Sequence, residues 1–456
     1  MKRVLCICLL VSLMISLVAC KGQTVQNPSS SGSSPTVSNP TDIPVEKPVE
    51  NPVENPVETP NVNENKTDIS ELSYNVHLFS KLMEDEELIE SSFCVSPYSL
   101  KQALLLAYVG AENGSDTQKE LGDLLDLIDN GKVSVHEFER DNRVILTSSK
   151  AAKFKVANVA LFDDSLIKSP DFDNLFVKPL NDYYNAAVEL ADLQDNSIVE
   201  KVNEFVNDNT EGTISELIKE PFSDDAKLVL LNAVYFLGNW QTPFDEYSTV
   251  KDKFKGLNGS FDIDFMNDTR TVKYFENDKI KSISLEYESD KNTINAPTFE
   301  MSFYLPVNNK TDIVELYNSL TDSEKEVFFD TKEYSYSETI VKLPKFELDT
   351  ELKLLDVLKA MGMTKAVDRA NKDFSNIADC DKYEGFYISD VIQKTYIKVD
   401  EKGTEASAVT GVMAGGIDSV QEKPKYKEFI ADRPFIYVVR DINTDTILFM
   451  GIMTNN

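Results

Sequence analysis

The chain has 456 residues and a formal net charge of −31 at pH 7, from 77 acidic and 46 basic side chains. So large an acidic excess, with no basic patch, argues against nucleic acid as a partner and against electrostatic docking on anionic lipid. The two histidines do not lie at ligand spacing from a cysteine or carboxylate cluster, so we expect neither a metal nor another cofactor.

The first segment, residues 1–19, is predicted to be a signal peptide. Lys2 and Arg3 precede an apolar run from Val4 to Val18 that is too short for a permanent membrane span. The run ends in Leu17-Val18-Ala19-Cys20, which resembles the lipobox of bacterial lipoproteins. We therefore expect Cys20 to be lipidated and the protein to be secreted and anchored at the cell surface through this lipid. An ordinary signal peptide that happens to contain Cys20 is the alternative.

Residues 20–66 are predicted to be the lipidated cysteine followed by a disordered linker. Serine, proline, valine and glutamate are abundant in it, and a Pro-Val-Glu unit repeats between Pro44 and Glu58. Such a segment buries too little apolar surface to offset the entropy of ordering. Its prolines keep it extended, at about 3.1 Å per residue where it is polyproline-like. The linker would act as a spacer, and cleavage within it would release the folded part.

Residues 67–456 are predicted to form one large domain, because no second linker divides them. Removal of the signal peptide and lipidation of Cys20 leave Cys94 and Cys380, which are far apart in the sequence. We therefore expect no disulfide framework, and we expect the protein to be a monomer.

Helices are predicted early in the domain, from capping residues and from apolar residues at helical spacing. Asp68 and Glu71 form a capping box for the first helix, and Ser96-Pro97 begins the second. The predicted helices cover 69–83, 97–110, a short segment capped by Ser115 and Gln118, 198 to about 212, and 352–361.

Strands are predicted mainly in the later part of the domain. Residues 226–237 are almost entirely apolar, which is typical of a strand buried on both faces. Further strands are predicted at 339–348, 387–399, 435–440 and 446–453. Helices that come first and strands that cluster later indicate an α+β fold with large sheets.

Several motifs follow one another in a recognisable order between about Thr67 and Asn456. They are Phe93-Cys-Val-Ser96-Pro-Tyr-Ser99-Leu, Asn232-Ala-Val-Tyr-Phe-Leu-Gly-Asn-Trp240, Leu343-Pro-Lys-Phe346, Leu358-Lys-Ala-Met-Gly-Met363, Tyr387-Ile-Ser-Asp-Val-Ile392, Val399-Asp-Glu-Lys-Gly-Thr-Glu-Ala406, Ala431-Asp-Arg-Pro-Phe435 and Ile447-Leu-Phe-Met-Gly451. Together they resemble the serpin family of serine protease inhibitors. The resemblance implies an α+β serpin fold with about three β-sheets, the large central one accepting the reactive loop, and eight or nine helices.

The resemblance also implies a group of residues that controls opening of the central sheet. We assign Ser96, Ser99, Asn232, Gln393 and Trp240 to it. The family usually has a histidine where this chain has Gln393. Glutamine both donates and accepts hydrogen bonds, so it can maintain a polar cluster, while the rate or pH dependence of sheet opening can differ.

The segment from Gly403 to Ile417 resembles the first part of a serpin reactive loop. As a strand it would place only small, uncharged side chains on one face, those of Thr404, Ala406, Ala408, Thr410, Val412 and Ala414. This pattern is typical of a strand that enters a protein interior, where an unpaired charge is costly. Gly403 would allow the backbone change that starts insertion. The predicted hinge consists of Glu401, Gly403, Thr404, Glu405, Ala406, Ser407, Ala408, Val409 and Thr410.

The function implied by the resemblance is irreversible, suicide-type protease inhibition and not enzymatic activity. Counting from Glu401 places the cleaved bond at Ile417–Asp418, whereas counting back from Arg433-Pro434 places it nearer Val420. We favour the first count because the loop is longer than usual on its C-terminal side. An isoleucine before the bond favours an elastase-like, subtilisin-like or papain-like target over a trypsin-like one.

Two other functions remain open at this point. A non-inhibitory serpin could act as a surface binding protein, although such members often have bulky or charged hinge residues. A solute-binding or enzymatic lipoprotein would share the signal and linker. It would need a ligand cleft or a catalytic cluster, and the sequence contains no Gly-x-Ser-x-Gly, P-loop or dinucleotide-binding motif.

Overall fold

The computed structural model describes residues 73–127, 134–290, 293, 295–382, 385–404 and 426–455. All of them belong to one compact unit, Lys66–Asn456. The predicted signal peptide, Cys20, the linker and the capping box at Asp68 and Glu71 lie outside the described residues. No helix in the described part of the chain has both the length and the apolarity to cross a membrane.

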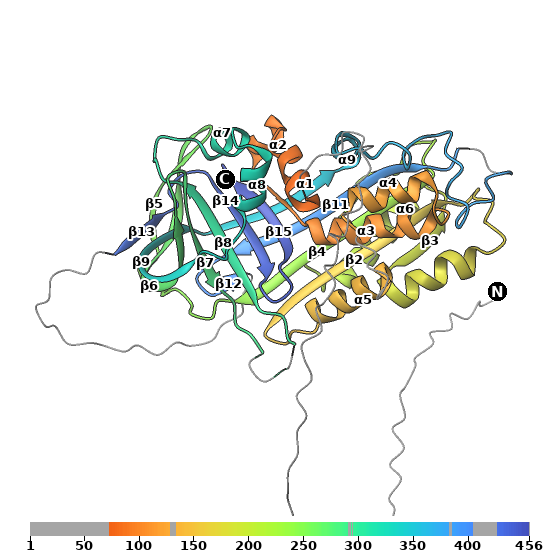
Figure 1. The fold of residues 1–456 in the computed structure, drawn as a ribbon. Helices are drawn as coiled ribbons and strands as arrows, with labels where there is room; N and C mark the ends of the chain where they lie inside the picture. Colours follow the sequence, from red (N-terminus) through yellow and green to blue (C-terminus); the bar gives the residue numbers. More distant parts are fainter. Residues whose placement is uncertain are drawn as a thin grey trace, which may run out of the picture. The chain divides into compact units, whose positions relative to one another are not determined.

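The α-helices lie mostly in the first half of the domain, as predicted. Figure 1 shows α3 to α6 gathered at one end, away from strands β5 to β9. The described helices are α1 (Tyr74–Leu82), α2 (Glu86–Ser91), α3 (Pro97–Gly110), α4 (Asp116–Leu124), α5 (Val135–Leu146), α6 (Ser197–Asn209), α7 (Ile313–Asn318), α8 (Asp322–Phe328) and α9 (Leu355–Ala360).

Two of these helices begin where their capping residues predict. Ser96 caps α3 by accepting a hydrogen bond from the backbone N–H of Ser99, and Pro97 occupies the first helical position. Ser115 caps α4 in the same way, through the N–H of Gln118. The helix predicted at 352–361 is too long at its start, because Leu352 pairs with Gln393 in a sheet and α9 begins at Leu355.

The central sheet contains six strands in the order β10-β11-β12-β4-β2-β3, and β11 also pairs directly with β4. Its long strands β2, β4 and β11 run side by side in Figure 1. The strands are β2 (Ala152–Asp163), β3 (Ala187–Ala191), β4 (Leu228–Asn239), β10 (Phe346–Lys353), β11 (Ile388–Val399) and β12 (Gly403–Thr404).

Both faces of the central sheet are covered, which explains the continuous apolar sequence of β4. Val229 and Leu231 pack with apolar residues of α6 on one face, whereas Val234 and Phe236 pack with the second sheet near the other end of the strand. Strand β4 therefore confirms the prediction of a strand buried on both sides.

The second sheet has nine strands, in the order β1-β15-β14-β8-β7-β6-β9-β13, with β5 paired to β6. Strand β6 joins its parts, because its first residues pair with β5 and its last with β7. The described residues thus form two hydrogen-bonded sheets where about three were expected. The strands are β1 (Phe93–Val95), β5 (Val250–Gly256), β6 (Gly259–Glu276), β7 (Ile280–Glu286), β8 (Phe299–Pro306), β9 (Ser335–Pro344), β13 (Lys427–Ile430), β14 (Phe435–Asp441) and β15 (Thr446–Met453).

The strand predicted at 339–348 is in fact two strands in different sheets. Strand β9 ends at Pro344 and β10 begins at Phe346. Between them, the N–H of Lys345 donates to the carbonyl of Asp264 on β6, at a distance of 2.8 Å. The chain changes sheets here without a loop, so an uninterrupted β pattern in the sequence conceals the junction.

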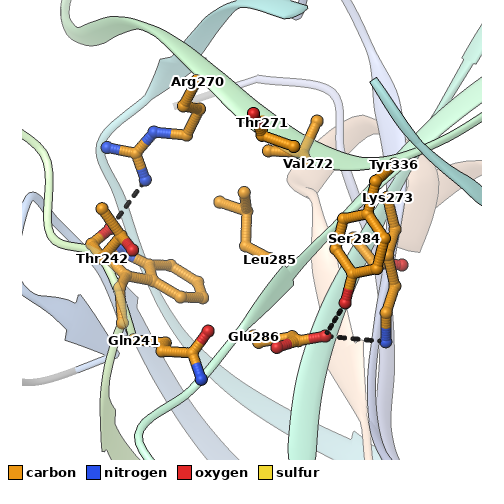
Figure 2. Close-up of a pocket in the computed structure, with 11 residues that line it drawn as sticks. Gln241, Thr242, Arg270, Thr271, Val272, Lys273, Ser284, Leu285, Glu286 and Tyr336 are labelled. Atoms are coloured by element: carbon orange, nitrogen blue, oxygen red, sulfur yellow. Dashed lines mark hydrogen bonds and ion pairs between the residues drawn. The ribbon is translucent and has the colours of Figure 1, made fainter. Parts of the chain in front are cut away.

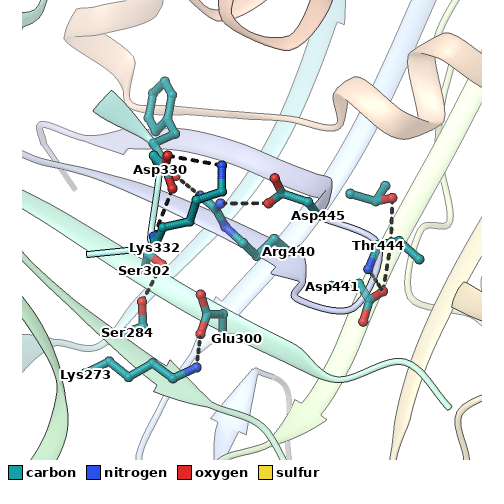
Figure 3. Close-up of polar contacts among 12 residues, drawn as sticks. Lys273, Ser284, Glu300, Ser302, Asp330, Lys332, Arg440, Asp441, Thr444 and Asp445 are labelled. Carbon is teal, nitrogen blue, oxygen red and sulfur yellow. Dashed lines mark hydrogen bonds and ion pairs between the residues drawn. The ribbon is translucent and has the colours of Figure 1, made fainter. Parts of the chain in front are cut away.

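A row of charged side chains, buried at Glu300 and Arg440 and partly exposed at Lys273 and Glu286, lies on one face of the second sheet (Figure 3). Glu300 of β8 is 1% exposed and lies directly between Glu286 of β7 and Arg440 of β14. Lys273 of β6 lies 2.9 Å from Glu300 and 3.0 Å from Glu286, and Arg440 donates to the carbonyl of Phe329. Because these charges contact groups of opposite sign or polarity, the sheet accommodates them in its interior.

The two described cysteines are free: Cys94 is fully buried in β1, and Cys380 is half-buried. Burial raises the pKa of Cys94 to about 12, which keeps it as the unreactive thiol.

We predict that iodoacetamide at mildly alkaline pH will alkylate Cys380 and spare Cys94 in the folded protein, because access and thiolate content both favour Cys380. Peptide mass spectrometry would measure the modification, with a denatured sample as the control in which both cysteines react. Alkylation of the two at similar rates in the folded protein would contradict the burial of Cys94.

Candidate functional site

The predicted hinge begins as a two-residue strand at one end of the central sheet. Gly403 and Thr404 form β12, which pairs with Asn239 and Gly238 of β4, and Thr404 also pairs with Val399 of β11. The start of the predicted loop is therefore already a strand of the central sheet. The other predicted loop residues lie outside the described residues, namely Glu405, Ala406, Ser407, Ala408, Val409, Thr410, Val412, Ala414, Ile417 and Asp418.

The glycine at position 403 is required by a close approach of two backbones. A Cβ atom there would lie 2.0 Å from the carbonyl oxygen of Gly238 on the neighbouring strand. Any side chain would therefore force β12 away from β4. The sequence suggested conformational freedom as the reason for Gly403, and the structure adds this contact as a second reason.

Trp240 and Tyr287 hold the turn that leads into β12. The backbone N–H of Trp240 donates to the carbonyl of Lys402 at 2.7 Å, and its indole N–H donates to that of Asp400 at 2.9 Å. The Trp240 ring stacks on Tyr287 with centroids 4.5 Å apart, and the Tyr287 hydroxyl lies 2.7 Å from that of Thr404. Sequence reasoning did not identify Tyr287.

Of the five residues that the sequence assigned to the sheet-opening group, Trp240 lies apart from the buried polar side chains, beside β12 at the end of the central sheet. Trp240 follows the last residue of β4, eight residues beyond Asn232, or about 26 Å along an extended strand. The motif that contains both residues runs from the middle of β4 to the residue after its end, so its first and last residues have different neighbours. Trp240 anchors the hinge, and Asn232 belongs to the cluster described below.

Glu401 fixes the same turn through an ion pair. Its buried carboxylate lies 2.8 Å from the ammonium of Lys345 and accepts a hydrogen bond from the Thr249 hydroxyl at 2.7 Å. Burial alone would raise the pKa of Glu401, but the hydrogen bonds from Lys345 and Thr249 outweigh it and hold the pKa below its usual value. Lys345 is 56 residues away in sequence, and no sequence signal pointed to it.

A cavity of about 250 Å³ adjoins this anchor and is lined by residues of β6 and β7 (Figure 2). On one side, Arg270 donates to the carbonyls of Thr242 and Pro243 and pairs with Asp268. On the other side, the Tyr336 hydroxyl donates to Glu286. The charged side chains of the lining have partners in or beside it, so the cavity supports the turn after Trp240 and we assign it no ligand.

A buried polar cluster lies beneath the middle of the seam between β4 and β11. Gln393 of β11 and Asn232 of β4 are paired in register, and the side-chain amide of Gln393 donates to that of Asn232 at 2.8 Å. The Gln393 amide also donates to the carbonyl of Ser96 and accepts from its N–H, at 3.0 and 2.8 Å. This arrangement joins both strands of the seam to the start of α3.

Asn232 extends the cluster to a third strand. Its amide donates to the hydroxyl and the carbonyl of Ser99 and to the side chain of Asn158 on β2, the last at 2.7 Å. The structure thus brings together Ser96, Ser99, Asn232 and Gln393 and adds Asn158. A lone asparagine within the apolar strand β2 was the available signal for Asn158. None of the five side chains titrates near neutral pH.

Comparison with known proteins identifies the fold as that of a serpin. The solved structure of Serpin48 from Tenebrio molitor matches with a TM-score of 0.70 and 25% identity, over 84% of this chain and 96% of that one. Residues 71–456 match the family model described as Serpin (serine protease inhibitor). This chain therefore belongs to the serpin family, as its motifs indicated, and membership supports protease inhibition in general.

Two relatives illustrate the range of the family. An uncharacterized serpin-like protein of Thermococcus kodakarensis is 32% identical over 363 residues, which cover 79% of this chain and 80% of that protein. Intracellular coagulation inhibitor 2 of Tachypleus tridentatus is 28% identical over 397 residues, covering 83% and 88%.

We predict that Gln393→His will make stability newly sensitive to acid. A buried imidazole disfavours its charged form, so its folded pKa would fall below about 6.5, and its protonation would oppose folding as the pH decreases. Thermal unfolding at several pH values from about 8 to 5.5 would measure this. The melting temperature of the variant should fall progressively further below that of the wild type.

The exposed Gln241 offers a control for the histidine substitution. Gln241→His should follow the wild-type curve across the same pH range. If the melting temperatures of Gln393→His and of the wild type changed with pH in parallel, the burial of the side chain at position 393 would be contradicted.

We predict that Lys345→Gln will destabilise the protein by on the order of 1–2 kcal/mol, between the values for exposed and buried pairs. This loss of unfolding free energy should be present above about pH 4.5. It should disappear as the pH falls through the pKa of Glu401 in the folded protein, because the carboxylate is then neutral. Lys332, an exposed residue paired with Asp330, provides a control. A loss no greater than that of Lys332→Gln would contradict the role of the ion pair.

Proposed function

We propose that this serpin is an irreversible, suicide-type protease inhibitor whose loop inserts into the central sheet after cleavage at Ile417–Asp418. The target would attack the loop as a substrate, form its acyl-enzyme and be trapped when the loop inserts. The single observation that carries this proposal is the position of β12, which is paired with β4 and β11 at the top of their seam.

The register of β12 matches the register of the closed seam. Thr404 pairs with Gly238 of β4 and with Val399 of β11, and the pairing is antiparallel to both. If the β12 ladder continued along β4 and β11 in the same register, Thr410 would pair with Asn232 on one side and with Gln393 on the other. Those two residues already pair with each other, so β4 and β11 would have to separate but not to slide. Insertion along this seam therefore requires only that β4 and β11 separate, with no change in their register.

The same register gives Thr410 a specific place in the inserted state. Residues directly opposite one another in a sheet point to the same face. The Thr410 hydroxyl would therefore enter the buried polar cluster between the side chains of Asn232 and Gln393. A hydroxyl both donates and accepts, so it can replace the hydrogen bond that these residues lose when the seam opens.

The length of the seam supports the assignment of the cleaved bond. Leu228 and Ile388 begin β4 and β11 and pair with each other. If the register of β12 continues to this end of the seam, Ala414 would pair with Leu228 and, because of the bulge after Ile388, also with Ile388. Ile417 lies three residues beyond, so a protease esterified to it would be held against that end of the sheet. Distortion of its active site there would prevent hydrolysis of the ester.

We further propose the setting in which the inhibitor acts. Ile417 favours an elastase-like, subtilisin-like or papain-like target, and the lipid on Cys20 would hold a monomeric inhibitor at the cell surface. These proposals depend on the sequence features given above.

We predict that mixing the protein with elastase, subtilisin or papain will give a covalent complex that survives a denaturing gel, whereas trypsin will give little. Thr404→Arg should abolish the complex, because Thr404 is fully buried and an arginine there would bury an unpaired charge. Mass spectrometry of the released C-terminal peptide would identify the cleaved bond.

Glu405 supplies the matched control for this substitution, since it would point to the opposite face in the inserted strand. Glu405→Arg should trap the protease about as well as the wild type. The proposal would fail if Thr404→Arg trapped equally well, or if every protease turned over the protein as a simple substrate.

A further inference from the structure

A second cavity, of about 320 Å³, lies where β4 and β11 begin. Its lining is partly apolar, with Val229 of β4, Ile392 of β11, and Ile218 and Phe222 from the chain between α6 and β4, and partly charged, with Lys219, Glu220, Glu351, Lys353 and Asp390. Val229, Ile392 and Ile218 belong to the apolar cluster shared with α6. The cavity therefore opens on the α6 face of the central sheet, opposite to the face that carries the polar cluster.

The part of the cavity wall at Ile218 is attached to α6, whereas the N–H of Lys227, just before β4, donates to the Ser389 hydroxyl of β11 at 2.7 Å. The side chain of Asn203 on α6 accepts hydrogen bonds from the N–H groups of Leu217 and Ile218, at 2.7 and 3.1 Å, and donates to the carbonyl of Ile218. Separation of β4 and β11 would leave these bonds in place. The wall at Ile218 can thus stay in position while β4 and β11, which form the floor of the cavity, separate.

The continued register of β12 brings one loop residue to this cavity. Met413 would pair with Val229 and Asp390, which pair with each other and both line the cavity. Since opposite residues share a face, the Met413 side chain would point into it. Along this face of the loop the residues are Glu405, Ser407, Val409, Gly411 and Met413. Met413 is the only long apolar side chain among them.

We propose that this cavity is the receiving site for the Met413 side chain when the loop inserts. The proposal rests on the insertion proposed above and adds the residue that secures the far end of the inserted strand. A methionine side chain is unbranched and adaptable, so it can pack against the apolar part of this lining, formed by Val229, Ile392, Ile218 and Phe222. Gly411, the preceding residue on this face, leaves the space over Ile392 free for it.

The test compares the full chain and its variants before and after one cut in the loop. Met413→Asp would replace the apolar side chain by a carboxylate that must lose water against Val229 and Ile392 in the inserted state, whereas Met413→Leu would keep an apolar side chain. Ser407→Asp is the matched control, because it adds the same charge to the same face away from the cavity. A subtilisin-like or papain-like protease would make the cut, and mass spectrometry would verify that it lies after Met413.

Nicking should raise the melting temperature of the wild type, Met413→Leu and Ser407→Asp by similar amounts. The gain of Met413→Asp should be smaller by about 5 °C, while the intact forms of all four proteins melt together. A full gain for Met413→Asp would overturn the assignment and would leave a small apolar ligand or the loop of a second copy as the occupant. No gain in the wild type would refute the proposed insertion itself.

Discussion

The hydrogen bond from Gln393 to Asn232 is the contact on which the arrangement of this protein depends. It crosses the seam between β4 and β11 inside a cluster where the amides also bond to Ser96, Ser99 and Asn158. Separation of the strands would leave these buried groups without partners until new ones arrive, which costs free energy. In the proposed mechanism the cluster would therefore oppose sheet opening, and a barrier of this kind would allow the uncleaved fold to persist.

The rest of the central sheet is organised around that seam. At one end Trp240, Tyr287 and Glu401 hold the start of the loop, and at the other end a cavity meets the first residues of β4 and β11. All three regions share one register, which β12 sets at the top. A continuous register means that the beginning, middle and end of insertion would be governed by the same pairing of residues.

The sequence predicted local features well and long-range ones poorly. Ser96 and Pro97 identified the start of α3, and the apolar run identified β4, because caps and patterns act over a few residues. The family resemblance brought Asn232 and Gln393 together. It did not reveal Lys345 as the partner of Glu401, since their contact exists only after the chain changes sheets at Lys345. The motif from Asn232 to Trp240 did not show that its two ends contact different neighbours, since these contacts depend on where each residue lies along β4.

The pairing of Gly403 and Thr404 with both neighbouring strands has a kinetic consequence. In the assembly of any ordered chain segment, the first contact is the slowest to form, because it restricts many torsions in return for little bonding. Here the pairs of Gly403 and Thr404 already exist in the uncleaved chain. The proposed insertion would therefore begin with propagation, one residue after another. Because the slow first step is already complete, insertion would be faster relative to hydrolysis of the acyl-enzyme.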